Sequence, residues 1–277
     1  MNQLKPHAVV RAHFKRDGYY FPLPALNKEE AAALRTKIEY AEHEVSTNLH
    51  QFDCFRTYSH LVIPSIAELA LDSRITDWVS AILGQDLLLL HTSLFIKEPM
   101  TGHFVSWHQD LTYWGLDGID EVTAWFAMTS ATIDNGCMRF IAGSHNKWVQ
   151  HEDRHHPDNM LSRSQEISVE VNEDDAVNAE LNAGEISLHH GRTFHASYPN
   201  HTDDRRIGLA FRYIMPSMRQ TCIENATAML ARGSDNYGHF ELIDPPTYLF
   251  APDDIARLKK IFTTENATYY QGAAYEK

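Results

Sequence analysis

The sequence has few cysteines, and they lie far apart. The three are Cys54, Cys137 and Cys222, so no CxxC pair exists among the 277 residues. This excludes a zinc ribbon or a thioredoxin-like motif and is typical of reduced thiols in a cytosolic protein. The N-terminus also lacks the apolar stretch of a secretory signal, and no run reaches the roughly 18 apolar residues of a membrane span. We therefore expect a cytoplasmic protein that does not enter the membrane.

Positive charge is scarce as well. Lys and Arg number 24 against 37 Asp and Glu, which gives a formal net charge of -13. Such a chain lacks the basic surface with which proteins hold nucleic acids or anionic membranes. A small-molecule ligand is the remaining expectation, because a few buried cations can form a binding site inside an acidic protein. The sequence leaves the oligomeric state open.

Repeats, low-complexity tracts and Gly/Ser linkers are also absent, so residues 1–277 are expected to form one domain. We divide it into a helical N-terminal part (1–86), a β-rich core (87–216) and a C-terminal extension (217–277). Within the core, the segment of about 150–175 is polar and charged. We interpret that segment as a long, lid-like excursion between strands.

Helix signals flank the β-rich core. Asn27 and Glu30 have the spacing of a capping box at the start of a helix that runs to about residue 46. A second helix is predicted over Ser73–Leu83, where Gly84 provides the C-terminal stop. A third is predicted near Pro252–Phe262.

The core consists of short β-prone runs that are separated by turn signals such as Asp134-Asn135-Gly136. Many short strands of this kind predict a mainly β fold with flanking helices, a sandwich or jelly roll. The predicted strands are Leu87–Lys97, Val105–His108, Val122–Thr129, Met138–Ile141, Ile167–Val171, Glu185–His189 and Ile207–Ile214.

A metal site is indicated by His108 and Asp110. Residues two apart on a strand point to the same face, so this imidazole and this carboxylate can converge on one ion. The H-x-D pattern occurs four times in a chain with 17 histidines, but only this pair stands between a strand-like run and an aromatic stretch. The other three lie in charged or turn segments without the rigid scaffold that a metal site needs. The residues alone leave a hydrogen-bonded structural pair as the alternative.

A second histidine from a distant strand would complete a two-His-one-carboxylate site, which suits Fe(II) because it leaves positions open for O₂ and a chelating cosubstrate. From spacing alone, His189, His190 and His195 all qualify. Arg206 lies eleven residues after His195, and a hairpin would return its guanidinium to the metal, where it could bind the distal carboxylate of a keto diacid. Period-two alternation places Arg205 on the opposite face. The alternative for Arg206 is a surface salt bridge with a nearby aspartate.

Three motifs occur in an order that points to a known family. The first is Trp107-His108-Gln109-Asp110, the second is the turn from Asn135 to His145, and the third is His195-x-Ser197-x-x-Asn200 followed by Arg206. Together they resemble the W-H-Q-D, N-G-(C/A)-L-x-(V/F)-(I/L)-P-G-S-H and H-x-S-x-x-N…R motifs of the phytanoyl-CoA dioxygenase superfamily of Fe(II)/2-oxoglutarate enzymes. The resemblance runs from about Leu89 to Pro216, nearly half of the chain.

This resemblance implies a double-stranded β-helix, a cupin-like jelly roll. It implies that three side chains bind Fe(II): His108, Asp110 and His195. By the same resemblance, Arg206 and Ser197 bind the far carboxylate of 2-oxoglutarate, and Trp125 lines that pocket unless it is only a core aromatic. Halogenases of the wider group have Ala or Gly at the position of Asp110, so the resemblance implies hydroxylation by O₂ with release of succinate and CO₂.

The stretches Val105–Leu116 and Asn159–Glu166 resemble a bacterial subgroup that includes oxygenases of 2-aminoethylphosphonate and its N-methylated relatives. A phosphonate needs nearby cations, and a trimethylammonium group needs an aromatic cage. The candidate substrate residues are Arg56, Lys97, Tyr113 and Arg163, for which the alternative is a surface charge or core packing. Other functions left open are hydroxylation of an amino acid or secondary metabolite, zinc-dependent hydrolysis with the same ligands, and a non-catalytic jelly-roll binding protein.

Overall fold

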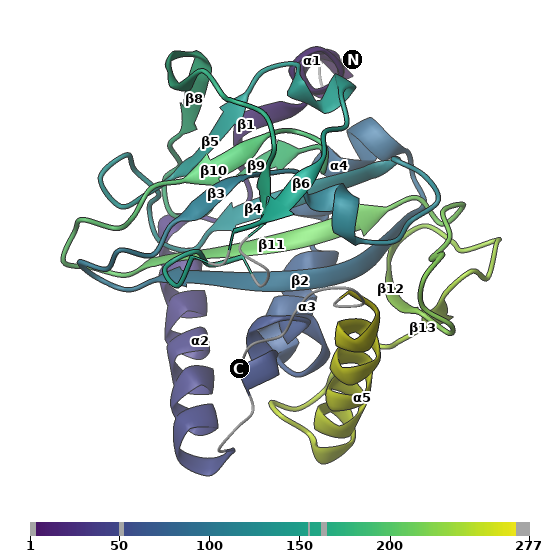
Figure 1. The fold of residues 1–277 in the computed structure, drawn as a ribbon. Coiled ribbons are helices and arrows are strands. Elements are labelled where there is room, and N and C mark those ends of the chain that lie inside the picture. Colours follow the sequence, from purple (N-terminus) through teal and green to yellow (C-terminus); the bar gives the residue numbers. More distant parts are fainter. Residues whose placement is uncertain (1–3, 50–52, 155, 162–164, 270–277) are drawn as a thin grey trace.

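The computed structural model describes residues 4–49, 53–154, 156–161 and 165–269. Its centre is a seven-stranded sheet with a four-stranded sheet above it (Figure 1). The seven-stranded sheet has the order β1 (Tyr19–Pro24), β9 (Glu185–His189), β4 (Glu121–Ala127), β11 (Arg206–Ile214), β2 (Leu87–Lys97), β12 (Thr227–Arg232) and β13 (Glu241–Leu242). The four-stranded sheet has the order β3 (Val105–His108), β10 (His195–Ser197), β5 (Met138–Ile141) and β8 (Ala176–Ala179). The predicted mainly β jelly-roll fold is confirmed.

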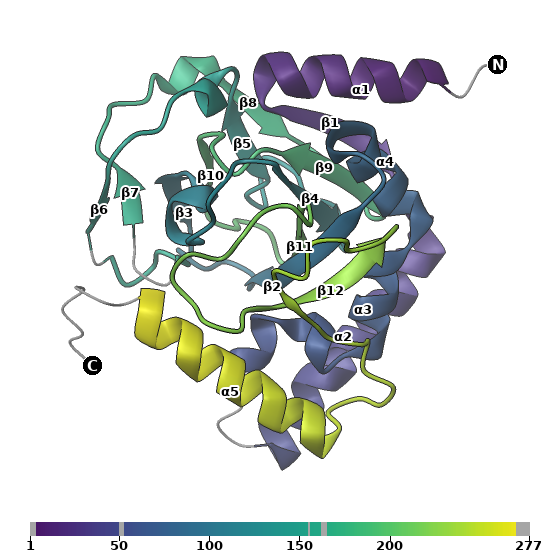
Figure 2. The same ribbon diagram turned by 90° about the vertical axis from the view of Figure 1, so that its right-hand side faces the viewer.

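Helices cover the outer face of the large sheet, as Figures 1 and 2 show. They are α2 (Lys28–Asn48), α3 (Pro64–Leu71), α4 (Ser73–Leu83) and α5 (Pro252–Tyr269). Helix α1 (Leu4–Asp17) lies at the edge of the sheet, against β1 and α4 (Figure 2). Alternation along β11 explains this arrangement, because its odd-numbered residues Ile207, Leu209, Phe211 and Tyr213 join the helices in one apolar core. The even-numbered residues face the opposite way, toward the small sheet. None of the helices in the described ranges has the length and apolar character needed to span a membrane.

The predicted helices are confirmed, with small differences at their ends. The Asn27 side chain accepts a hydrogen bond from the Glu30 backbone N–H, and the Glu30 carboxylate accepts one from the Asn27 N–H, each at 2.8 Å. The helix that begins at Ser73 ends at Leu83 and is followed by Gly84 at φ 103°. The last helix continues to Tyr269, past the predicted end.

The strand predictions miss the elements with the least sequence signal. Strands β1, β8, β10, β12 and β13 and helices α1 and α3 were not predicted. β10 has only three residues, which is too short for any alternation to be visible. Strand β1 lies inside the part that we expected to be helical, and it pairs with β9 at the edge of the large sheet.

The segment of 150–175 contains more regular structure than we expected. In its described part, β6 (His151–Asp153) and β7 (Gln165–Ile167) form a two-stranded sheet, and the predicted strand Ile167–Val171 overlaps β7 by one residue. This sheet is fixed to β3, because Ser106 Oγ donates a hydrogen bond of 2.6 Å to the Gln165 carbonyl. The segment therefore packs directly behind the strand that carries His108.

Candidate active site

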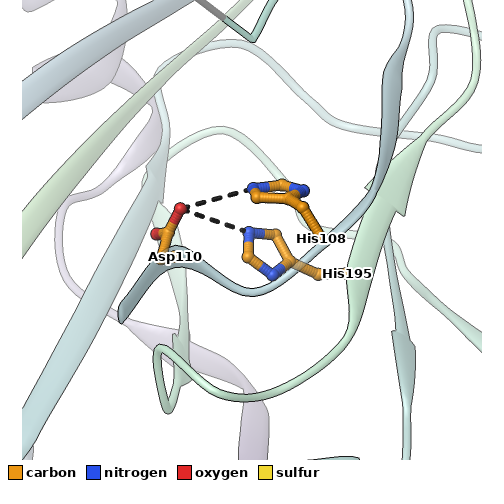
Figure 3. A group of neighbouring side chains, drawn as sticks. All are labelled: His108, Asp110 and His195. Carbon is orange, nitrogen blue, oxygen red and sulfur yellow. Dashed lines mark ion pairs between the residues drawn. The ribbon is translucent and has the colours of Figure 1, made fainter. Parts of the chain in front are cut away.

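Two neighbouring strands of the small sheet bring the predicted metal ligands together. His108 at the end of β3 pairs in register with His195 at the start of β10, and Asp110 follows in a short 3₁₀ helix. His108 Nε2 lies 3.3 Å and His195 Nε2 lies 4.0 Å from Asp110 Oδ1 (Figure 3). One ligand atom from each of the three residues lies within 4.8 Å of the others. The described residues contain no other such group of three, and His189 and His190 belong to none.

Backbone hydrogen bonds orient both imidazoles. His108 Nδ1 lies 2.9 Å from the Ser106 carbonyl oxygen, and His195 Nδ1 lies 2.9 Å from the Thr193 carbonyl oxygen. A carbonyl only accepts hydrogen bonds, so each Nδ1 carries the proton and each Nε2 presents a lone pair toward Asp110. This is the tautomer that a metal-binding histidine requires.

The electrostatics also fit a cation. Burial alone would raise the pKa of Asp110, but the nearby Arg212 holds that pKa well below its usual range. Asp110 is therefore ionised at neutral pH. Burial lowers the pKa of His195 well below its ordinary value, which keeps this ring neutral and able to donate its lone pair. One carboxylate and two imidazoles form a donor set that fits Fe(II).

A cavity extends from these three residues between the two sheets. The cavity is lined by Phe95, Val105, His108, Asp110, Thr123, Trp125, Met138, His189, His195, Ala196, Ser197, Arg206, Ala210 and Arg212.

Arg206 forms one end of this cavity. Its side chain is buried and donates one hydrogen bond, from Nη2 to the Gly136 carbonyl at 3.0 Å, while its Nε has no partner. The guanidinium carbon lies 5.3 Å from the centre of the Trp125 ring. Burial lowers the pKa of Arg206 to about 10, so it stays charged at neutral pH. A buried cation with unused donors is suited to a carboxylate.

Gly208 makes room for Trp125 between the strands. A Cβ at this position would lie 1.9 Å from Trp125 Cζ2. The indole can therefore lie flat across β11 only because residue 208 has no side chain. The packing fixes Trp125 next to Arg206, and sequence analysis gave no sign of this dependence.

Lys97 and Ser197 lie at the same end. Lys97 is fully buried opposite Arg206 on β2, and its Nζ donates to Ser197 Oγ at 2.6 Å and to the Tyr198 carbonyl. Burial, and then the nearby Arg206, lower the pKa of Lys97 to about 6. Lys97 does not line the cavity itself, so the structure places this candidate substrate residue behind Ser197.

The other candidates lie elsewhere. Arg205 points to the opposite face, as alternation predicts, and pairs with Glu42 and Glu98. Arg56 is half exposed, pairs with Glu42 and does not line the cavity. Tyr113 has a described backbone in the 3₁₀ helix after the metal-ligand strand, but its side chain and the whole of Arg163 lie outside the described residues.

Sequence analysis missed Arg212 and Thr123 as cavity residues, and it considered His189, which also lines the cavity, only as a possible metal ligand. Arg212 Nη2 lies 3.6 Å from Asp110 Oδ2, which makes it the cation nearest to the candidate metal ligands. A signal was present, because Arg212 follows Arg206 by six residues and an even spacing along a strand returns to the same face.

Comparison with known proteins identifies the family. Residues 14–208 match the phytanoyl-CoA dioxygenase (PhyH) family, which is more than half of the chain. The chain belongs to the phytanoyl-CoA dioxygenase family. With this membership and the donor set described above, the expected cofactors Fe(II) and 2-oxoglutarate are confirmed.

Relatives within and near this family agree with the assignment. A probable alpha-ketoglutarate-dependent hypophosphite dioxygenase of Stutzerimonas stutzeri is 29% identical over 186 residues, which are 66% of this chain and 60% of that protein. The phytanoyl-CoA dioxygenase domain-containing protein 1 of Mus musculus is 33% identical over 132 residues, 45% of this chain and 44% of that protein. The chain thus spans 60% or less of the length of these curated relatives.

Solved structures cover the chain more fully. The apo form of ThoJ, a non-heme monooxygenase, has a TM-score of 0.85 and 32% identity and covers 95% of this chain and 98% of its own. CytC3 with Fe(II) and alpha-ketoglutarate has a TM-score of 0.67 at 24% identity and covers 88% of this chain and 96% of its own, a likeness of fold. The fold that this chain shares with the non-heme monooxygenase ThoJ therefore extends over nearly all of its length.

Proposed function

We propose that this protein is an Fe(II)- and 2-oxoglutarate-dependent dioxygenase that hydroxylates an unactivated C–H bond of a small polar molecule. The observation that carries the proposal is the convergence of His108, Asp110 and His195 at one wall of a cavity whose far end is the buried cation Arg206. The overall reaction would convert substrate, 2-oxoglutarate and O₂ into hydroxylated substrate, succinate and CO₂.

Each residue would have a separate task. His108, Asp110 and His195 would bind the iron, which supplies the activation of O₂ when it is bound. Arg206 would bind the distal carboxylate of 2-oxoglutarate with donors that have no other partner. Binding a charged cosubstrate at both ends fixes its orientation before reaction.

Ser197 and Trp125 would assist Arg206. Ser197 Oγ accepts the hydrogen bond from Lys97, so its own proton is available to a carboxylate in the cavity. Trp125 lies beside the guanidinium and closes the wall against water. A dry site strengthens the charge pairing between Arg206 and the cosubstrate.

For the substrate, we propose an organophosphonate of the 2-aminoethylphosphonate type, with or without N-methyl groups. Its support is the subgroup resemblance of Val105–Leu116 and the relative named for hypophosphite, a small phosphorus oxyanion. Hydroxylation of an amino acid or a secondary metabolite is the alternative within the same chemistry.

The test begins with the protein under anaerobic conditions. Fe(II) and 2-oxoglutarate together should produce a visible charge-transfer absorption that neither produces alone. On admission of O₂, a panel of phosphonates, amines and amino acids should reveal a compound that makes succinate form faster. If zinc restored a hydrolytic activity that did not need O₂, the protein would be a hydrolase. Iron binding without any 2-oxoglutarate binding would indicate a binding protein.

A further inference from the structure

The cavity has a second buried cation, opposite the first. Strand β11 presents Arg206, Gly208, Ala210 and Arg212 to the small sheet, so two arginines are separated by two small residues. At about 3.4 Å per residue, their Cα atoms are roughly 20 Å apart. Both guanidinium groups line the same cavity. Because Arg206 is assigned to the cosubstrate, Arg212 remains at the end where a substrate would lie.

Arg212 has unused hydrogen-bonding capacity. Its side chain is only 6% exposed. Nη1 donates to Ser93 Oγ at 2.9 Å, Nη2 lies 3.6 Å from Asp110 Oδ2, and Nε has no partner. A guanidinium has five N–H donors, and a buried cation that uses so few of them is costly unless a ligand completes its pairing.

The residues beside Arg212 also have buried polar atoms without hydrogen-bond partners. Register places His91, Arg212, Thr123 and His189 next to one another across β2, β11, β4 and β9. All four are buried, and each has a polar atom without a partner: His91 Nδ1, Arg212 Nε, Thr123 Oγ1 and both ring nitrogens of His189. Native proteins satisfy the large majority of such buried groups, so four in one row indicate a polar ligand.

Aromatic rings pack against the residues at the Arg212 end of the cavity. The Trp114 ring lies 5.3 Å from the His91 ring and 5.4 Å from the guanidinium carbon of Arg212. Tyr58 packs against His91 at 5.4 Å and holds a left-handed backbone at φ 61°, which is uncommon for a bulky residue. The polar row is thus backed by rings that restrict the position of Arg212.

The charge of the loaded site also favours an anion. With iron and 2-oxoglutarate bound, the ion, Asp110, Arg206, Arg212 and the dianion leave a formal charge of about one positive unit. A substrate with one negative charge would balance the cavity.

We propose that Arg212, with Thr123 and His189 beside it, is a second anion site that binds the oxyanion group of the substrate. The inference rests on the proposed function. It deepens that function by limiting the substrate to a small molecule with a phosphonate, phosphinate or carboxylate group. The planar guanidinium fork can pair with two oxygens of such a group, and the His189 imidazole and the Thr123 hydroxyl, which line the same cavity, can bind the others.

The experiment compares Arg212→Gln, Arg212→Lys and wild type in the anaerobic Fe(II)·2-oxoglutarate complex. Three probes are titrated and followed by the change that they cause in the charge-transfer band: 2-aminoethylphosphonate, hypophosphite and β-alanine. We expect Arg212→Gln to weaken binding of the recognised probe about tenfold to a hundredfold. Arg212→Lys keeps the charge but loses the planar fork, so its affinity for the probe should lie between those of Arg212→Gln and wild type. In both variants 2-oxoglutarate affinity should change less than threefold.

Arg56→Gln is the matched control, because Arg56 pairs with Glu42 and does not line the cavity. A second measurement uses only the wild-type protein, in case the variants do not fold. The dimethyl ester of 2-aminoethylphosphonate keeps the ammonium group but has no charge on phosphorus, and it should bind at least tenfold more weakly than the free phosphonate. The probe that binds best shows whether the site prefers a phosphorus oxyanion or a carboxylate.

Two results would overturn the inference. One is equal binding of the free phosphonate and its dimethyl ester by the wild-type protein. The other is an Arg212→Gln variant that loses iron affinity but not probe affinity, which would make Arg212 a positioning residue for Asp110. Failure of the proposed function is distinguishable, because then the wild-type protein would form no charge-transfer band with Fe(II) and 2-oxoglutarate.

Discussion

The two ends of the cavity hold their arginines in different ways. Arg206 is fixed by a backbone carbonyl and by the Trp125 ring, and none of these contacts involves the candidate metal ligands. Arg212 is held by side chains alone, Ser93 and Asp110, and Asp110 is itself a candidate ligand. Substitutions at the Arg206 end should therefore weaken the binding of 2-oxoglutarate only. Substitutions at the Arg212 end should also affect the binding of the metal.

The first way to test this comparison is to remove the residue that belongs to both the metal site and the Arg212 end. We expect Asp110→Ala to reduce succinate formation to the background, because a ligand is lost. Arg212 would also become an unpaired buried charge, which should lower the free energy of unfolding by about 3 kcal/mol without preventing folding. Activity assays and denaturant unfolding followed by circular dichroism measure the two effects.

Asp203→Ala is the control for this change. Asp203 belongs to another H-x-D pair, but it is exposed and lies in a turn. We expect the Asp203→Ala variant to have the activity and stability of wild type. Retained iron binding and turnover in Asp110→Ala would contradict the assignment of the metal site.

The second test disturbs only the cosubstrate end. Arg206→Leu should raise the Kd for 2-oxoglutarate by about tenfold to a hundredfold, because a charge-assisted pairing is lost. Its affinity for iron should stay close to that of wild type, as measured by titration in the absence of 2-oxoglutarate.

Arg205→Leu provides a matched comparison on the same strand edge. Its guanidinium pairs with Glu42 and Glu98 on the opposite face, so its loss should cost stability but not 2-oxoglutarate affinity. If the two variants affected 2-oxoglutarate equally, the alternation that separates them would be irrelevant to binding.

A third, smaller effect concerns the packing that positions Arg206. Gly208→Ala would place a Cβ within the Trp125 ring space and push the indole toward the guanidinium. We expect a loss of about 1–3 kcal/mol in the free energy of unfolding and a several-fold weaker 2-oxoglutarate affinity. Gly102→Ala is the control, because its nearest contact would be an ordinary 3.7 Å. Equal behaviour of both variants would mean that Trp125 has no part in the site.

The difference between the two ends also explains what the sequence could predict. Arg206 stands in a motif with His195, and the strand that carries it has large apolar residues at alternate positions on its other face. Arg212 lies on the same face as Arg206, as the even spacing indicates, but it belongs to no motif, and its burial depends on the Trp114 ring and on Asp110 from other parts of the chain. Motif and spacing therefore led to Arg206, whereas Arg212 was missed.

The same limit applies to the fold. Strand β2, with eleven residues, was predicted at its observed ends, whereas β10, with three, was not predicted at all. Strand β10 exists because it pairs with both β3 and β5, so its structure is determined by tertiary contacts and not by propensity. His195 could be proposed from its motif although its strand could not.

A fourth test concerns Lys97, whose protonation state decides whether the Arg206 end carries one positive charge or two. The pKa of Lys97 is about 6 in the folded protein, below its ordinary value of 10.5. Between these values the unfolded chain binds more protons than the folded one, so this residue makes the free energy of unfolding rise with pH. The difference in unfolding free energy between wild type and Lys97→Met should therefore increase from pH 6 to pH 9, by up to about 1.4 kcal/mol per pH unit. Denaturant unfolding at several pH values measures it, and Lys28→Met, a change at an exposed lysine, should show no such increase. Parallel curves for wild type and Lys97→Met would mean that Lys97 is charged when folded, and that the Arg206 end carries two positive charges instead of one.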